Sequence, residues 1–180
     1  FVMTNSTATG SGAVNGMAVN LSDAAVTQAS IFTGAARFLS GAATASLAAN
    51  TATDLFDNES GTNSSVVDTL SGIENVTTGA GRDYVVGSSA TNVIIAGDGI
   101  DWISAGDGAD YVKADTSGEN DIDRVIGGTG DDTYVYSDAG AADIYIEAAS
   151  SGYDTILVNG NLSIATLTVG TTATAGGAVG

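Results

Sequence analysis

A nine-residue repeat in the middle of the chain constrains the fold more than any other feature of the sequence. Four units follow one another without a gap over residues 78–113 and read TGAGRDYVV, GSSATNVII, AGDGIDWIS and AGDGADYVK. Two further units, GENDIDRVI and GGTGDDTYV, span residues 118–135 if residues 114–117 are an insertion. A unit this short cannot bury a core by itself, so the units must stack on one another as a solenoid.

The residue types at three positions of the unit explain how each unit folds. Glycine recurs at the second and fourth positions, as Gly79, Gly81, Gly97, Gly99, Gly106, Gly108, Gly128 and Gly130. The sixth position is Asp or Asn in every unit: Asp83, Asn92, Asp101, Asp110, Asp123 and Asp132. The eighth position is Val, Ile or Tyr. Glycine permits the positive φ of a tight turn, and the last three residues then form a short strand whose middle side chain points inward.

Stacking brings the sixth-position side chains together. If two units complete one coil, turns n and n+2 lie on the same edge, with coils about 4.8 Å apart. One edge then carries Asp83, Asp101 and Asp123, and the other carries Asn92, Asp110 and Asp132. Calcium prefers several oxygen ligands of this kind. We therefore predict that these six residues and the turn glycines bind calcium at four sites, of which Asp110/Asp132 is the best furnished.

The unit resembles the RTX, or haemolysin-type calcium-binding, repeat, whose pattern is G-G-x-G-x-D-x-U-x. Residues 127–135 fit this pattern at every position, whereas the second unit departs from it with Ser88, Ala90 and Asn92. The similarity extends over residues 63–158. The resemblance implies a parallel β-roll, calcium in the turns, and export from a bacterium by a type I system.

The charge of the chain favours cations as partners. The net charge is −17, and 20 of the 21 acidic residues lie within 54–158 beside only Arg82, Lys113 and Arg124. Such a surface repels phosphates, which argues against nucleic acids and anionic membranes as partners. The absence of His and Cys excludes catalytic triads, thiol nucleophiles and the common zinc sites. No apolar run is long enough for membrane insertion.

The segments on either side of the repeats are less regular. Residues 1–62, rich in Ala, Ser and Thr, are predicted to pack on the roll. Met17, Val19 and Leu21 alternate as in a strand. A helix with Ser22 as N-cap, or further β-structure, follows. Residues 159–180 are predicted to form an uncharged strand and tail.

The outward seventh and ninth positions of the units are unusually apolar. They include Tyr84, Trp102 and Tyr111. Tyr84 and Trp102 fall on the same edge in adjacent coils, so their rings can stack. The favoured interpretation is a ladder covered by the N-terminal segment, and the alternative is a contact surface for another subunit.

These observations predict an all-β chain, a right-handed parallel β-roll (β-solenoid) whose N-terminal segment is irregular or in part helical. The predicted function is that of a calcium-stabilised extracellular structural module, from a bacterial surface-layer, filament or adhesin-type protein. Its uncapped ends predict a homo-oligomer, as a filament or lattice. The alternative is the non-catalytic calcium-binding C-terminal module of a type I-secreted enzyme. No catalytic residues are predicted, since each well-placed carboxylate has a calcium role. The start at Phe1 predicts a processed product or an internal piece.

Overall fold

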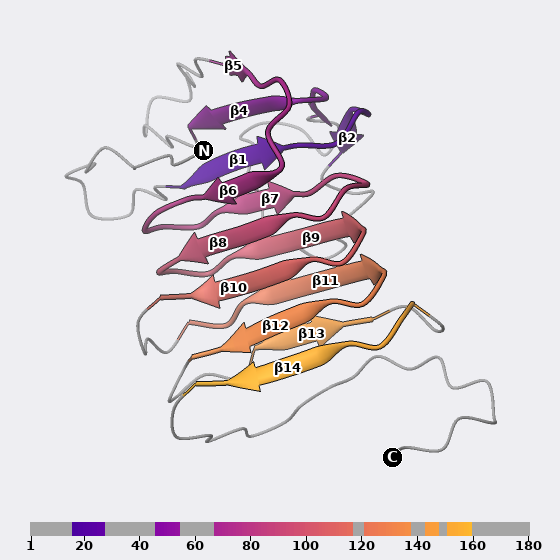
Figure 1. The fold of residues 1–180 in the computed structure, drawn as a ribbon. Helices are drawn as coiled ribbons and strands as arrows, with labels where there is room; N and C mark the ends of the chain where they lie inside the picture. The colour runs from indigo at the N-terminus through magenta and orange to yellow at the C-terminus, as the bar shows by residue number, and fades with distance from the viewer. Residues whose placement is uncertain are drawn as a thin grey trace.

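The computed structural model describes residues 16–27, 46–54, 67–116, 121–137, 143–147 and 151–159. These residues form an all-β structure, and no helix occurs among them. Short strands alternate between two sheets that face each other, so that the chain winds as a flattened parallel solenoid (Figure 1). The β-roll predicted from the repeat is confirmed.

Two sheets form the walls of the roll. In spatial order, the seven-stranded sheet contains β13 (Ile144–Ile146), β11 (Arg124–Thr129), β9 (Trp102–Asp107), β7 (Tyr84–Val86), β1 (Met17–Asn20), β4 (Thr51–Asp54) and β5 (Val67–Thr69). The five-stranded sheet contains β14 (Thr155–Val158), β12 (Thr133–Tyr136), β10 (Tyr111–Asp115), β8 (Val93–Gly97) and β6 (Asn75–Thr77). A separate pair joins β2 (Val26–Thr27) and β3 (Ser46–Leu47).

The strand register confirms that two units complete one coil. Tyr84 pairs with Trp102 in one sheet, and Val93 pairs with Tyr111 in the other, each in parallel and two units apart. The eighth-position side chains of both sheets point inward and form the core. Its buried members at this position are Val76, Val85, Ile94, Ile103, Val112, Val125, Tyr134 and Tyr145. Period-nine spacing therefore translates directly into one apolar column per wall.

The N-terminal segment extends the seven-stranded sheet. β1 lies parallel to β7 and occupies the place that the strand of a preceding unit would take, while β4 and β5 continue the sheet antiparallel. Met17, Val19 and Leu21 all lie in the core, as their alternation predicted. These three strands extend the seven-stranded sheet beyond β7, the strand of its first repeat unit.

The helix predicted to start at Ser22 is wrong over its first turn. β2 pairs antiparallel with β3 instead, and residues 28–45, which carry the rest of the predicted helix, lie outside the described residues. The buried Asn20 side chain explains the difference, because its amide nitrogen donates to the carbonyls of Ala24, Leu47 and Ala48. Local side-chain bonds of this kind favour a turn over a helix start.

An aromatic ladder on the outer face of the seven-stranded sheet confirms the stacking predicted for the seventh position. The rings of Tyr84 and Trp102 stack with centroids 6.5 Å apart and an interplanar angle of 17°. Arg124, one coil further, lies over the Trp102 ring. Tyr84 is buried in a second apolar cluster with Leu47 and Val26 of the N-terminal segment. The segment therefore covers this part of the ladder, as favoured above, whereas Tyr111 on the other sheet stays exposed.

Candidate calcium sites in the turns

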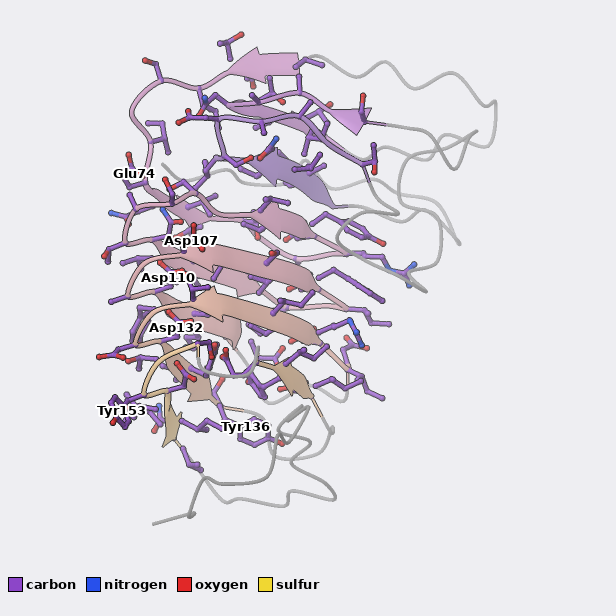
Figure 2. The ribbon with its side chains drawn as sticks, turned by 90° about the vertical axis from the view of Figure 1, so that its right-hand side faces the viewer. Glu74, Asp107, Asp110, Asp132, Tyr136 and Tyr153 are labelled. Carbon is purple, nitrogen blue, oxygen red and sulfur yellow. The ribbon has the colours of Figure 1, made fainter. Side chains whose placement is uncertain are left out.

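The sixth-position side chains form two columns, one along each edge of the roll. We call Asp83, Asp101, Asp123 and Asp143 the first column, and Asn92, Asp110, Asp132 and Asp154 the second column. Figure 2 shows Asp110 and Asp132 one above the other on the edge of the roll. Each column member stands immediately before a strand, so the parallel register of the strands stacks the side chains.

Hydrogen bonds join the members of each column. In the first column, the Oδ1 atom of Asp101 accepts the backbone N–H of Asp83 at 2.8 Å, and that of Asp123 accepts the N–H of Asp101 at 2.8 Å. In the second, Asp110 accepts from Asn92 at 2.8 Å and Asp132 accepts from Asp110 at 2.8 Å. One carboxylate oxygen of each residue is therefore used for stacking, and the other is left for a different role.

The two columns begin differently at their N-terminal ends. The first starts with a backbone donor, since the N–H of Met17 bonds the Oδ1 atom of Asp83 at 2.6 Å. The second starts with the neutral amide of Asn92. That amide donates to the carbonyl of Glu74 at 2.7 Å, and its oxygen accepts the N–H of Ser88 at 2.7 Å. The Asn92 amide is thus satisfied by the protein itself.

The turn glycines allow adjacent coils to approach closely. Seven of the eight predicted glycines have positive φ: Gly81, Gly97, Gly99, Gly106, Gly108, Gly128 and Gly130. At Gly99, a Cβ atom would collide with the carbonyl oxygen of Gly81 in the coil before it. Only glycine permits both this backbone conformation and this contact.

Burial makes the column carboxylates hard to ionise on their own. It raises the pKa of Asp83 and of Asp110 to about 6. It raises the pKa of Asp123 to about 9, with a further contribution from the charge of Asp115. The pKa of Asp101 lies well above its usual range because of burial and the flanking Asp83 and Asp123. An opposite charge close to these oxygens would favour the ionised form.

The second carboxylate oxygens of the columns fit a hard cation. Within the described residues, the Oδ2 atoms of Asp101, Asp110 and Asp123 are buried and have no hydrogen-bond partner. A buried ionised oxygen without a partner is costly, and calcium coordinates carboxylate and carbonyl oxygens. Asp83, Asp101, Asp110, Asp123 and Asp132 would hold the ions. When bound, calcium would supply the positive charge that the chain lacks here.

Comparison with known families agrees with this geometry. A family model described as the RTX calcium-binding nonapeptide repeat, in four copies, matches residues 68–99, 86–116 and 117–140. The middle of this chain is an RTX repeat array. Such repeats bind calcium ions. Comparisons with curated proteins and with solved structures gave no match.

Both columns continue beyond Asp132 and beyond the residues that match the family model. The Oδ1 atom of Asp143 accepts the N–H of Asp123 at 3.1 Å, and that of Asp154 accepts the N–H of Asp132 at 3.0 Å. The last two units are eleven residues long, so a search at period nine does not align them. The strands β13 and β14 that follow these acids, with Tyr145 and Ile156 inward, are the signal that identifies them.

The insertion predicted at residues 114–117 is wrong, because the first two of these residues continue a regular strand. β10 runs on through Ala114 and Asp115, and Asp115 pairs with Gly97. Asp115 thus occupies the position of a turn glycine. The inward, buried Ala114 prolongs the core column, which is why the strand continues there.

The C-terminal end of the second column gathers additional carboxylate. Asp132, Glu147 and Asp154 each place one oxygen within 4.8 Å of the others. The hydroxyl of Tyr134 donates to Glu147 and lies 3.4 Å from the Oδ2 atom of Asp132. Burial, together with the charges of Asp154 and Asp132, raises the pKa of Glu147 to about 7. This end of the second column offers three carboxylates and one neutral donor.

Proposed function

We propose that the chain is a calcium-stabilised extracellular structural module that self-assembles at a bacterial cell surface, within a surface layer, a filament or an adhesin-type protein, after type I secretion. In this proposal, residues 63–158 form the calcium-binding roll, residues 1–62 pack on it, and residues 159–180 supply an uncharged strand and tail. The six predicted ligands, Asp83, Asn92, Asp101, Asp110, Asp123 and Asp132, act together with the turn glycines.

The burial of the acidic columns supports the calcium-dependent part. The segment 54–158 carries 20 acids against three bases, and its column carboxylates are buried. Extracellular calcium modules bind with dissociation constants of roughly 10⁻⁴–10⁻³ M, far above cytosolic calcium levels. We therefore expect the roll to stay unfolded until it reaches calcium outside the cell.

The ends of the roll support self-assembly. Within the described residues, β5 is the outermost strand of the seven-stranded sheet at one end of the roll. β14 is the outermost strand of the five-stranded sheet at the other end. Val67 on β5 is 54% exposed, and Leu157 on β14 is 48% exposed. Open strand edges with apolar side chains pair readily with a second chain, and head-to-tail pairing that does not close gives filaments or lattices. Among the described residues, no helix is long and apolar enough to span a membrane.

Sedimentation velocity with and without calcium tests the assembly. The wild-type chain is expected to form large species in millimolar calcium and to dissociate when a chelator is added. Leu157→Lys, at the open end, should reduce assembly while leaving the circular dichroism spectrum unchanged. Tyr111→Lys is the matched control, because Tyr111 is exposed on the flank of the roll and not at its end. A folded wild-type monomer at high concentration in calcium would instead favour the non-catalytic module of a type I-secreted enzyme.

A further inference from the structure

The tetrapeptide Ala-Gly-Asp-Gly occurs twice in the repeats, at residues 96–99 and 105–108. Each copy places an Asp–Gly peptide bond at a turn, Asp98–Gly99 on the edge of the first column and Asp107–Gly108 on the edge of the second (Figure 2). In an Asp–Gly pair the backbone amide can attack the preceding side chain with little obstruction, because glycine has no Cβ atom. The two copies therefore place the same reactive pair in two different surroundings.

The side chains and backbones of the two pairs are held alike. The Oδ1 atom of Asp98 accepts the hydroxyl of Thr116 at 2.7 Å, and that of Asp107 accepts the hydroxyl of Thr129 at 2.7 Å. The backbone N–H groups of both aspartates donate to the preceding coil at 3.1 Å. The glycine of the first pair has a φ of 120° and that of the second a φ of 121°. The carboxyl groups that would be attacked are therefore matched.

The attacking group, the amide nitrogen of the glycine, distinguishes the two pairs. The N–H of Gly108 donates to the carbonyl of Thr129 in the next coil at 2.8 Å. The fourth-position glycines of two other units, Gly81 and Gly130, make the same bond to the coil that follows them. Within the described residues, the N–H of Gly99 has no such acceptor.

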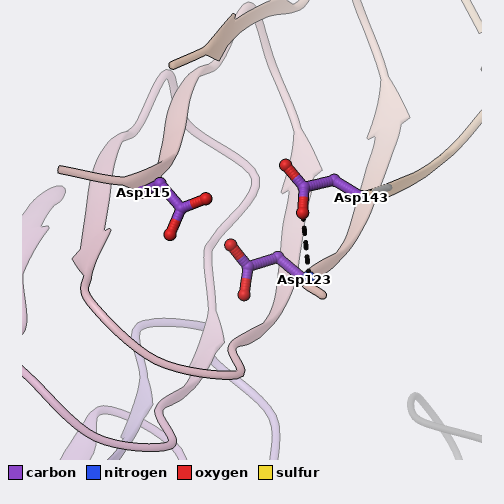
Figure 3. Close-up of side chains that lie close together, drawn as sticks. All are labelled: Asp115, Asp123 and Asp143. Atoms are coloured by element: carbon purple, nitrogen blue, oxygen red, sulfur yellow. Dashed lines mark hydrogen bonds between the residues drawn. The ribbon is translucent and has the colours of Figure 1, made fainter. Parts of the chain in front are cut away.

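The irregular turn in the coil after Gly99 accounts for this difference. Asp115 precedes Asp123 there by eight residues, whereas Gly97 precedes Asp101 by four. Figure 3 shows Asp115 and Asp123, the two ends of this turn. The four extra residues interrupt the regular match of N–H and carbonyl groups between coils, and Gly99 lies next to the interruption.

We propose that Asp98 is a site of spontaneous isomerisation to isoaspartate in the folded roll, and that Asp107 is protected from it. The amide nitrogen of Gly99 attacks the side-chain carboxyl carbon of Asp98. The amide proton and the carboxyl hydroxyl leave as one water molecule, and a succinimide ring forms. Water then opens the ring at either carbonyl, which gives isoaspartate or restores aspartate. The water lost is regained, so the step needs no other reactant.

A second hydrogen bond also favours reaction at Asp98. The N–H of Gly81 donates to the carbonyl oxygen of Asp98 at 2.8 Å, and this oxygen belongs to the same peptide group as the amide of Gly99. A bond to the carbonyl polarises the peptide group, so its N–H proton is lost more easily. Solvent exposure alone would favour the opposite order, because Asp107 is exposed and Asp98 is half-buried.

Isomerisation would disturb the packing of this turn. It lengthens the main chain by one carbon atom between the two glycines that flank Asp98. The N–H of Asp98 donates to Gly79 at 3.1 Å, and its carbonyl accepts from Gly81 at 2.8 Å. A longer chain cannot keep both bonds at the present coil spacing. The turn that precedes Asp101 would therefore loosen, and the first column would lose support.

Ageing of the calcium-saturated chain at neutral pH, followed by peptide mapping that distinguishes isoaspartate, tests the proposal. Chymotryptic cleavage after Trp102 places Asp98 and Asp107 in separate peptides. In the folded chain, isoaspartate should accumulate at Asp98 roughly three- to tenfold faster than at Asp107, the factor that one hydrogen bond supports. In urea the two rates should be similar, because the tetrapeptide is the same.

Asp98→Glu and Asp107→Glu are matched variants, since glutamate keeps the charge but closes the corresponding larger ring far more slowly. Asp98→Glu should abolish both the isoaspartate and the slow loss of β signal on ageing, whereas Asp107→Glu should keep both. The wild-type comparison decides even if a variant does not fold. Equal rates in the folded chain, or a faster rate at Asp107, would overturn the proposal. So would a folded chain that forms no isoaspartate at Asp98 in the time that the chain in urea forms it.

Discussion

The two columns of the roll follow one pattern but neutralise their charge differently. In the first column, the Oδ2 atoms of Asp101 and Asp123 are buried without hydrogen-bond partners. In the second, the Asn92 amide is satisfied by Glu74 and Ser88, and Tyr134 lies against Asp132. The first column thus leaves two buried carboxylate oxygens to an ion, whereas the second leaves one, that of Asp110, and begins with an amide that protein groups satisfy. Calcium should therefore stabilise the turns of the first column more than those of the second.

The comparison extends to the backbone of the turns. A Cβ atom at Gly99, on the first column, would collide with the carbonyl oxygen of Gly81. At Gly108, on the second column, it would lie 2.9 Å from the carbonyl of Ala90, because the second unit has Ala in place of the fourth-position glycine. The looser contact is local to Gly108, because a Cβ atom at Gly130 on the same column would again collide with a carbonyl oxygen, that of Gly108.

Removal of calcium is expected to have the largest effect. Excess chelator should abolish the β signal in circular dichroism at pH 7.5, because the column carboxylates repel one another once the ions leave. Magnesium should restore little of it, since magnesium demands a tighter octahedral geometry and gives up its water reluctantly. An unchanged β spectrum in chelator would mean that the apolar core alone holds both columns.

Within the second column, Asp110 should matter more than Asn92. Asp110 stands between Asn92 and Asp132, so Asp110→Ala is expected to lower the calcium stoichiometry by up to two. It should also lower the free energy of unfolding in calcium by roughly 3–5 kcal/mol. Asn92→Ala, which removes a neutral amide with its own protein partners, should cost roughly 1–3 kcal/mol. Calorimetric titration and denaturant unfolding of both variants give the two quantities. Equal losses would show that neighbouring turns do not share ions.

The backbone difference predicts a smaller effect of substitution. Gly99→Ala should lower the free energy of unfolding by about 3 kcal/mol, because it combines a positive φ with a clash against Gly81. Gly108→Ala has a similar φ but a looser contact, so about 1–2 kcal/mol is expected. Gly72→Ala is the control, since nothing lies within 4 Å of its Cβ position. If Gly108→Ala proved the more damaging, the looser contact opposite Ala90 would not be what sets the cost of the substitution.

The smallest expected effect is a pH dependence of the calcium-free chain. The folded-state pKa values of about 6 for Asp83 and Asp110, and about 9 for Asp123, lie above the ordinary value of 3.8. The folded state therefore holds more protons than the unfolded state over this interval, and its stability falls as pH rises. In chelator, the β signal should recover as pH is lowered from 9 toward 4.

Asp123→Asn separates the contributions of the columns to this dependence. It should reduce the part of the pH dependence between about 6 and 9, because burial and the charge of Asp115 raise the pKa of Asp123 to about 9. Asp110→Asn should affect only the part near pH 6. The measurement is circular dichroism in chelator across the pH range for both variants. Identical profiles would contradict the difference between the columns.

Much of the fold was predictable because the repeat period sets the geometry. A period of nine with an inward eighth residue requires two walls, and the coil spacing then stacks every second sixth-position residue. The register of Tyr84 with Trp102 and their stacked rings follow from that arithmetic. The core column and both acidic columns are consequences of the same spacing.

The parts that were not predictable break the period or depend on contacts distant in sequence. Asp143 stands in an eleven-residue unit, so its alignment becomes visible only through the strand that follows. Asp115 was missed because the extra residues were placed between units, whereas β10 continues through it. The parallel pairing of β1 with β7 joins residues far apart in sequence. The alternation of Met17, Val19 and Leu21 predicts a strand but does not indicate which strand it pairs with.

Calcium anomalous scattering from a crystal grown with calcium tests most directly the claim that ions neutralise the columns. Peaks are expected within about 2.3–2.6 Å of the carboxylate oxygens of Asp101, Asp123 and Asp110. An ordered roll whose columns show no anomalous peak at millimolar calcium would contradict the account, because protons or protein groups would then hold the turns together.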